Sequence, residues 1–391
     1  MSPAAGHRLF INRSNLHDVH VGADPDAPAA RPLQSGQARL EVQCFALTAN
    51  NITYAVFGQL MKYWQFFPAP NATLGCLPVW GFARVVESRA EGVDAGQQVY
   101  GYFPAGTHLV VQPVRTSARG FVDGAVHRQE LAAVYNQYSF TDSFTDSSTT
   151  AGNVSPQTAE QARQDGLRAV LQPLFMTAFL LNDFFATNNF FGAQQLLLSS
   201  ASSKTAMATA YGLAQRRGTV GHPQVVGLTS ASNQAFVQGL GCYDRTLTYG
   251  DVAQLDAHTP AAYIDFAGSG PVRSAVHSHF GEQLKYSSAI GGTHWTDLGS
   301  SASLPGPRPI LFFAPSQAAQ RSAPPPAGLG REVLEQRMAQ AWQAFVAHAS
   351  QGPQPWVEIS HQQGAQATEA GYRALLDGQA HPRQGLMLSL L

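Results

Sequence analysis

Residues 195–218 read QLLLSSASSKTAMATAYGLAQRRG, and this stretch decides the fold. The short apolar run at 195–199 predicts a buried strand, and the small polar residues at 199–205 predict a turn. Residues 206–216 predict a helix, which Gly218 closes. A strand that passes through a tight turn of small residues into a helix is the first unit of a doubly wound parallel sheet.

The chain that follows repeats this alternation. Residues 225–229 and 262–266 predict further strands, with a helix at about 233–240 between them, and residues 286–290 predict a fourth strand. Short strands that alternate with helices of about ten residues predict an α/β fold with a parallel, doubly wound sheet.

The regions around this sheet differ in pattern. Residues 166–185 place apolar side chains at the spacing of a buried helix, although Pro173 would kink it or mark a new start. Segment 300–330 is rich in Pro and Ser and predicts a connector, residues 331–348 predict an amphipathic helix, and the final MLSLL predicts a strand.

The first part of the chain is β-rich. Short apolar runs separated by Gly, Pro and Asn predict strands at 40–47, 79–86 and 109–114, and the polar stretch 139–156 predicts an exposed loop. Because 391 residues exceed one ordinary core, we expect two domains.

The amino-acid composition indicates which classes of binding partner are favoured. The chain has 24 Lys+Arg and 25 Asp+Glu, a net charge of −1, and no basic block, so nothing favours a nucleic-acid partner. The cysteines Cys44, Cys76 and Cys242 lie far apart without a CxxC pair, which predicts neither a disulfide framework nor a structural zinc site and fits a reducing cytoplasm.

No membrane segment or leader is predicted. The most apolar stretch, 173–181, is much shorter than the roughly 20 residues of a membrane helix. The start, MSPAAGHRLF, lacks the regions of a signal peptide. We therefore expect a cytoplasmic protein with a small-molecule substrate and no membrane partner.

The turn at 199–205 is the candidate phosphate site. Dinucleotide folds usually carry G-x-G-x-x-G there, whereas this turn offers small polar side chains at the start of a helix together with one amine. The candidate cofactor contacts are Ser200, Ser202, Ser203, Lys204 and Thr205. The alternative is that Ser202 or Ser203 only caps the helix of a decayed site.

The end of the second strand indicates the cofactor type. An NAD-preferring fold places an acid there for the ribose hydroxyls, but this strand ends in Thr229 and Ser230, followed by Asn233. Hydroxyls and an amide can donate hydrogen bonds to a 2′-phosphate, whereas an acid would repel it. The sequence therefore favours NADP over NAD. Asn233 or Ser232 can also cap the following helix.

These pieces, in this order, resemble the medium-chain dehydrogenase/reductase (MDR) superfamily, especially its quinone-reductase and enoyl-reductase branch. The segments ALTANNITYAVFG, LPVWGFARVVES, GVDAGQQVYGYFP, LGCYDRTLTY and YIDFAGSG are similar to characteristic MDR segments. The motifs NNITY, YWQFFP, PVWGFA, YGYFP and YNQY resemble, more narrowly, a domain-of-unknown-function family on the same scaffold.

The resemblance implies a GroES-like domain at 1–165, a Rossmann-like domain at 166–315 and a return to the GroES-like domain at 316–391. It also implies dimers that join Rossmann sheet edges. The positions that hold catalytic zinc in other members carry Thr53 and Trp80-Gly81 here, which are not zinc ligands, so we expect no zinc.

Further contacts follow from the resemblance. Gly291, Gly292 and Thr293 stand where the superfamily contacts the nicotinamide amide, and Gly268 follows the strand at 262–266. His294, beside them, is a candidate acid, although a lone His next to Trp295 is more often structural. The pair His277 and His279 does not share a helix face, which argues against a metal site.

A tyrosine hydroxyl donates a hydrogen bond while staying neutral at pH 7, so it can polarise a carbonyl. Tyr54 is the first candidate, because its region faces the nicotinamide in the superfamily; Tyr135 and Tyr138 are further candidates, with Asn51 as a polar partner. The alternative for each tyrosine is a packed aromatic with a satisfied hydroxyl. The same choice between substrate pocket and core applies to the aromatic run Tyr63, Trp64, Phe66 and Phe67.

The leading hypothesis is an NADP-dependent, zinc-independent oxidoreductase that reduces an enone, quinone or enoyl-thioester. A second is a cofactor-independent lyase or isomerase on the same scaffold. A third is a non-catalytic binding protein that keeps the shape without the chemistry.

Overall fold

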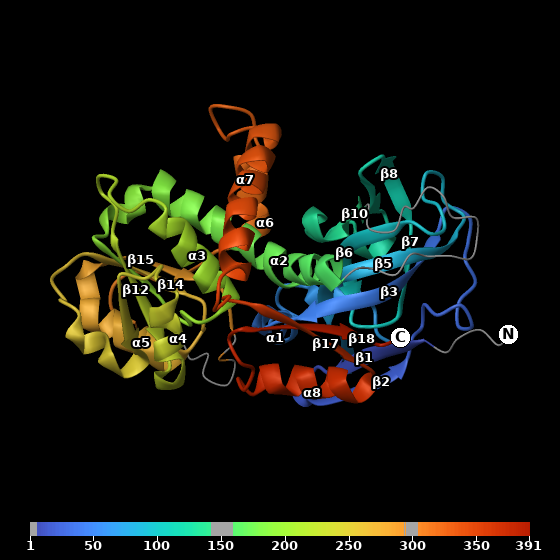
Figure 1. Ribbon diagram of the computed structural model, residues 1–391, viewed down its shortest axis with the longest axis horizontal. Helices are drawn as coiled ribbons and strands as arrows, with labels where there is room; N and C mark the ends of the chain where they lie inside the picture. Colours follow the sequence, from blue (N-terminus) through green and yellow to red (C-terminus); the bar gives the residue numbers. More distant parts are fainter. Residues whose placement is uncertain (1–5, 142–158, 293, 295–303) are drawn as a thin grey trace. The chain divides into compact units, whose positions relative to one another are not determined.

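The computed structural model describes residues 6–141, 159–292, 294 and 304–391 (Figure 1). The chain forms two compact units. Unit 1 comprises Met1–Val170, Glu358–Ala380 and Gln384–Leu391, and unit 2 comprises Leu171–Val357 and His381–Arg383.

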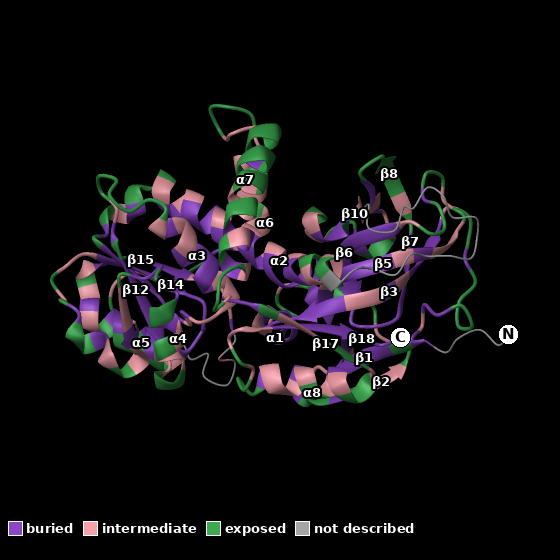
Figure 2. Cartoon of the chain, in the orientation of Figure 1, coloured by how far each residue is buried: buried purple, intermediate pink, exposed green. Residues whose placement is uncertain are grey.

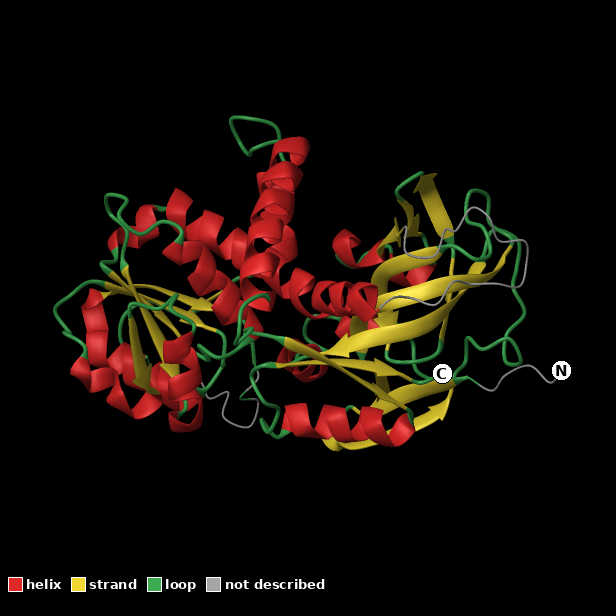
Figure 3. Ribbon diagram, in the orientation of Figure 1, coloured by secondary structure: helices red, strands yellow, loops and turns green. Residues whose placement is uncertain are grey.

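Unit 1 is built mainly from β-sheets (Figure 3). A three-stranded sheet has the order β2-β1-β4, and a nine-stranded sheet has the order β17-β18-β3-β5-β6-β10-β9-β8, with β7 paired to β3. The strands are β1 His7–Asn12, β2 Asn15–Ala23, β3 Ala38–Leu47, β4 Leu74–Cys76, β5 Pro78–Ser88, β6 Gln98–Pro104, β7 His108–Val111, β8 Pro113–Ser117, β9 Gly120–Asp123, β10 Gln137–Thr141, β17 Glu358–Gln363 and β18 Gln384–Ser389. This confirms the β-rich first part, where the run at 109–114 becomes two strands, β7 and β8.

Gly81 allows the long central strands of unit 1 to pair closely. It lies on β5 opposite Phe45 of β3, where the carbonyl oxygen of Cys44 would stand 2.2 Å from an added Cβ atom. That space is too small for any side chain, so the register requires glycine in the segment PVWG.

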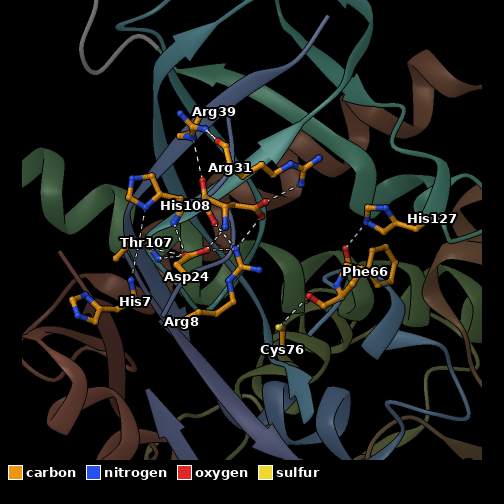
Figure 4. A network of polar contacts seen from close by, with 12 residues as sticks. His7, Arg8, Asp24, Arg31, Arg39, Phe66, Cys76, Thr107, His108 and His127 are labelled. Atoms are coloured by element: carbon orange, nitrogen blue, oxygen red, sulfur yellow. Dashed lines mark hydrogen bonds and ion pairs between the residues drawn. The ribbon is translucent and has the colours of Figure 1, made fainter. Parts of the chain in front are cut away.

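A buried polar network fastens the amino-terminal strand to unit 1 (Figure 4). The Arg8 guanidinium, only 1% exposed, donates to Asp24 at 2.7 Å, to Asp26 at 3.0 Å and to the carbonyl of His108 at 2.7 Å. Asp24 also accepts from the backbone N–H groups of Thr107 and His108. Since a buried charge is tolerated only when it is paired, this network holds β1, the 24–26 turn and β7 together.

Unit 2 contains a six-stranded parallel sheet of order β13-β12-β11-β14-β15-β16. Its strands are β11 Gln195–Leu198, β12 Gln224–Thr229, β13 Arg245–Thr248, β14 Ala261–Asp265, β15 Leu284–Ala289 and β16 Ile310–Leu311. In chain order this is 3-2-1-4-5-6, the dinucleotide-binding arrangement, so the predicted fold class is confirmed. Its central strands are buried (Figure 2), as the apolar runs require.

Helices link and cover these strands. Unit 2 contains α3 Lys204–Ala214, α4 Gln234–Gly239, α5 Gly270–Phe280, α6 Ala314–Arg321 and α7 Arg331–Ser350. Unit 1 contains α1 Ala49–Val56 and α8 Ala365–Leu376. Outside the β-rich first part, the sequence missed β13, β17 and α8, and the expected connector at 300–330 contains β16 and α6.

The observed units also differ from the expected boundaries. Residues 316–357 belong to unit 2, and the chain returns to unit 1 at Glu358. The reason is packing: Phe345 of α7 stacks on Phe175 at 5.2 Å, and Arg321 of α6 pairs with Asp183. Both partners lie on the unit 2 portion of helix α2 (Ala159–Thr187).

Helix α2 runs through Pro173 without a break. Among the described residues it is the one helix long and apolar enough to cross a membrane, with a window of mean hydropathy 1.4. More than half of that window, 56%, is buried inside the protein, which is also true of a core helix. The expectation from 173–181 alone therefore understated the length of this apolar helix.

Candidate functional site

The turn between β11 and α3 has a fixed shape. Ser200 has a left-handed φ of 48°, an uncommon conformation for a residue other than glycine. The backbone N–H of Ala201 donates to Leu228 at 3.0 Å, and the Tyr243 hydroxyl donates to the Ala201 carbonyl at 2.9 Å. The turn is thus held from β12 and from the segment before β13, with the start of α3 beside it.

Of the two expected roles of the turn serines, the structure shows the capping role, while cofactor contact stays a prediction. Ser203 is the N-cap of α3, and its hydroxyl accepts a weak 3.4 Å hydrogen bond from the N–H of Ala206. The Ser202 hydroxyl accepts from the side chain of Asn233 at 3.2 Å. The Thr205 carbonyl accepts from Thr209 within the helix. Capping and cofactor contact remain compatible, because a capped helix still presents its first N–H groups.

Lys204 is more enclosed than the sequence suggests. Its ammonium group donates to the carbonyl of Pro382 at 3.1 Å, and Pro382 lies in the short segment His381–Arg383 that belongs to unit 2. Loss of hydration lowers the pKa of Lys204 to about 8. The amine is therefore anchored at the amino terminus of α3, where a cation can face a phosphate.

Asp265, at the end of β14, organises the neighbouring turn. One of its oxygens accepts from Ser199 and from the N–H of Gly268, both at 2.9 Å, while the other accepts from Arg273 at 3.0 Å. Gly268 has a φ of 73°, a conformation that favours glycine. The carboxyl ends of β11 and β14 are thereby joined at the edge where a parallel sheet binds ligands.

Hydroxyl side chains lie at the end of β12, and an arginine lies against the helix α4 that follows. The Thr229 hydroxyl is buried without a partner among the described residues, and the hydroxyls of Ser230 and Ser232 lie 2.9 Å apart. Asn233 precedes α4 but makes no side-chain cap bond; it binds Ser202 instead. The Arg383 guanidinium lies 5.1 Å from the ring of Phe236, one turn into α4.

The nicotinamide-side candidates follow β15. The N–H of Gly291 makes a long 3.4 Å contact with the carbonyl of Asp265, and the N–H of His294 donates to Ala267 at 2.8 Å. Gly292 is buried beside Gly291. The His294 ring lies 6.0 Å from Tyr249, edge to face. Thr293 lies outside the described residues.

Unit 1 brings several phenols together, at the position of the predicted catalytic tyrosine. The ring of Tyr54 lies 4.5 Å from Tyr63, 5.7 Å from Tyr102 and 6.4 Å from Tyr135. Trp80 lies 5.2 Å from Tyr102. We call Tyr54, Tyr63, Trp80, Tyr102 and Tyr135 the tyrosine box. It includes two of the predicted catalytic tyrosines, Tyr54 and Tyr135, and Tyr63 of the aromatic run.

Two other predictions are corrected. Asn51 is not a partner of Tyr54: its side-chain oxygen accepts from the N–H of Thr48 at 2.7 Å, and its amide donates to Pro78 at 2.8 Å, so it caps α1. Tyr138 lies outside the box, where its hydroxyl donates to the carbonyl of Tyr102 and accepts from Arg128. Both side chains have structural partners.

The sequence missed three residues. Tyr102 and Trp80 lie on β6 and β5 within YGYFP and PVWG. Tyr102 was quoted only as part of a segment that resembles the family, and Trp80 was named only as a position that lacks a zinc ligand. Arg383 precedes a predicted strand. No local sequence pattern links it to α4, because Arg383 and its contact residue Phe236 lie far apart in the sequence.

The absence of zinc stays a prediction. In the described part of the chain, no three His, Cys, Asp or Glu side chains are grouped so that they could hold a metal ion. His277 faces the carbonyl of Pro305 and the hydroxyl of Ser287, both at 2.9 Å, and His279 faces the carbonyl of Leu255 at 2.8 Å. Each histidine is used in packing.

Solved structures share this fold along nearly the whole chain. The CurA protein of Vibrio vulnificus in complex with NADPH aligns over 98% of this chain and 99% of its own, with a TM-score of 0.57 and 11% identity. The CurK enoyl reductase gives 0.52, with 12% identity over 99% and 100%. The human synaptic vesicle membrane protein VAT-1 homolog-like protein gives 0.51, with 13% identity over 99% of both chains. No curated protein matches the sequence.

The chain therefore shares the fold of these proteins, with a GroES-like unit and a Rossmann unit, as the sequence predicted. The family model described as "Protein of unknown function (DUF2855)" matches residues 45–381. The chain belongs to this family.

Proposed function

We propose that this protein is an NADP-dependent, zinc-independent reductase of a polarised alkene or carbonyl. The observation that carries the proposal is the turn after β11, which offers serine hydroxyls and the Lys204 amine at the start of a helix in a 3-2-1-4-5-6 sheet. A helix terminus with small residues and a cation fits a pyrophosphate without the usual glycines.

The residues at the end of β12 fit the additional phosphate of NADP. Ser230, Ser232 and Asn233 supply neutral polar groups, and the orphaned Thr229 hydroxyl is available to a ligand. Arg383 adds a cation one helical turn away. Arginine binds phosphate in a fork geometry, which favours the 2′-phosphate over a bare ribose.

When bound, NADPH would supply a hydride, and the protein would orient and polarise the acceptor. Tyr54 would donate the balancing proton, with His294 as the second candidate acid. The substrate classes that suit this chemistry are an enone, a quinone or an enoyl-thioester. CurK is described as an enoyl reductase, and CurA was solved with NADPH, which supports the same class of reaction here.

A homodimer joined through the Rossmann sheet edge belongs to the same proposal. The edge strand β16 exposes Ile310 and Leu311, at 53% and 54%, and within the described part of the chain it pairs on one side only, with β15. Apolar residues on an open edge favour pairing with a second copy.

The test is a side-by-side calorimetric titration of NADPH and NADH into the purified protein. Tight NADPH binding with weak NADH binding supports the proposal and justifies screening enones and enoyl-thioesters. If neither nucleotide binds, the turn has lost its cofactor-binding role and the reductase proposal is wrong. A lyase, an isomerase or a binding protein on the same scaffold then becomes the better account.

A further inference from the structure

Tyr243 lies beside the turn between β11 and α3, in the short segment that joins α4 to β13. Its hydroxyl donates to the carbonyl oxygen of Ala201 at 2.9 Å, and this hydrogen bond is buried. The backbone N–H of the same alanine donates to the carbonyl of Leu228, on β12, at 3.0 Å. Both backbone polar groups of Ala201 are therefore held, one by the tyrosine and one by the strand.

The position of Tyr243 is itself fixed by the residue that follows it. The N–H of Asp244 donates to the carbonyl of Val225 at 2.9 Å, and the Asp244 carboxylate accepts from the N–H of Val225 at 2.7 Å and from Arg217 at 2.9 Å. Gly227, on the same strand as Val225, leaves room for the ring, since an added Cβ atom would stand 2.9 Å from a ring carbon of Tyr243. Tyr243 thus reaches the turn from a firm support on β12.

The turn needs such support because residues 199–205 include no glycine. Ser200 adopts a left-handed φ of 48°, a conformation that is strained for a residue with a side chain but not for glycine. Strain of this kind persists only where the surrounding structure holds the backbone in place. The two hydrogen bonds to Ala201, the next residue, come from outside the turn and supply that hold.

The carbonyl that Tyr243 holds sets the direction of the next N–H. The peptide between Ala201 and Ser202 is trans and planar, so the N–H of Ser202 points away from that carbonyl and from the tyrosine hydroxyl. In the described part of the chain, this N–H has no backbone acceptor. Helix α3 begins two residues later, and its first N–H groups lack partners within the helix. Such a set of donors favours an anion, for which a pyrophosphate is suited.

We propose that Tyr243 is a positioning residue for the cofactor, whose hydroxyl holds the peptide after Ala201 so that the N–H of Ser202 donates to the pyrophosphate of NADP. This inference rests on the proposed reductase function and adds the residue that keeps the glycine-free turn in its binding conformation. Burial raises the pKa of Tyr243 well above its ordinary value, so the hydroxyl keeps the proton that it donates at neutral pH.

The experiment compares the full-length wild type with Tyr243→Phe, a change that removes only the hydroxyl. Without nucleotide, amide hydrogen exchange should become about 3- to 10-fold faster in peptides that cover residues 199–205, the effect of one lost hydrogen bond. Exchange in peptides from α5 should not change. In calorimetric titrations, NADPH binding should weaken by about 3- to 10-fold. Binding of adenosine 2′-phosphate, which has no pyrophosphate, should stay the same.

Tyr372→Phe is the matched control. Tyr372, on α8 of unit 1, is also fully buried, but its hydroxyl lacks a partner among the described residues. This variant should change neither the exchange of 199–205 nor either affinity. The inference is overturned if Tyr243→Phe leaves exchange in the turn unchanged, or if it speeds exchange equally throughout unit 2. Equal weakening of NADPH and adenosine 2′-phosphate would overturn it too.

The wild type separates this inference from the function on which it rests. If the wild type binds NADPH and Tyr243→Phe weakens that ligand alone, both stand. If the two proteins bind NADPH equally well, the reductase proposal stands and the role of Tyr243 is wrong. If the wild type binds no NADPH, the reductase proposal is wrong. Faster exchange in the turn of Tyr243→Phe would then retain the hold of Tyr243 on the turn and overturn its role toward a cofactor.

Discussion

The Ser199 hydroxyl donates to the Asp265 carboxylate at 2.9 Å, across 66 residues of chain. Ser199 directly follows β11, and Asp265 ends the adjacent parallel strand β14. The N–H of Ala267 donates back to the same hydroxyl at 3.1 Å. Arg273 completes the pairing of a carboxylate that is 1% exposed. This contact fixes the two turns that face the proposed cofactor.

Asp265→Asn should lower the free energy of unfolding by about 3–5 kcal/mol, because it leaves Arg273 without its buried anion. Ser199→Ala should cost about 1–2 kcal/mol, the usual value for one lost hydrogen bond with a buried acceptor. Urea unfolding followed by circular dichroism measures both. The control is Glu335→Gln, which breaks the exposed pair with Arg331 and should change stability by less than about 1 kcal/mol. Equal losses in all three variants would contradict the role of Asp265.

Lys204 should make stability depend on pH in the alkaline range. Its pKa is lowered to about 8 in the folded protein, against about 10.4 in an unfolded chain. Between these values the unfolded state binds more protons, so the contribution of Lys204 to stability rises with pH from about 8 to about 10.4. Below pH 8 the cost of the buried charge is fully present.

The measurement compares unfolding free energies of the wild type and Lys204→Met from pH 7 to pH 10. The advantage of Lys204→Met should be largest at pH 7 and shrink as the pH rises. Lys285→Met, which removes an exposed lysine bonded to the carbonyl of Glu282, should show a constant difference. A constant difference for Lys204→Met as well would contradict the lowered pKa.

Arg383→Gln should weaken NADPH binding by about 10- to 100-fold and leave NADH binding unchanged, because a charged hydrogen bond to phosphate contributes about 1.5–3 kcal/mol. Paired calorimetric titrations give the ratio of the two affinities. Arg331→Gln, which changes an exposed side chain at the start of α7, is the control and should leave both affinities unchanged. Equal weakening of NADPH and NADH would show that Arg383 supports the fold and not the 2′-phosphate.

The sequence predicted the sheet of unit 2 well, because its strands are short and continuously apolar and its helices follow at regular spacing. β13 escaped notice, since Arg245 and the threonines of RTLT interrupt the apolar pattern. β17 was missed for the same reason, because every residue of EISHQQ is exposed or half-buried. Parallel pairing with β18 defines that strand, and such pairing is not encoded locally.

The site was predictable where one segment carries it. The turn at Ser199–Ser203 could be located from its small residues, because strand, turn and helix are consecutive. The tyrosine box could not, since its members come from five elements and only their register brings the rings together. Arg383 depends on a tertiary contact with Phe236, which periodicity does not report.

Tyr54→Phe should reduce the turnover number for NADPH-dependent reduction by about 10²- to 10⁴-fold, the usual contribution of a general acid, with NADPH affinity unchanged. Steady-state kinetics of the wild type and the variant test this, with Tyr372→Phe as the control at wild-type rate. Full activity in Tyr54→Phe would transfer the role of acid to His294, which His294→Gln would then test.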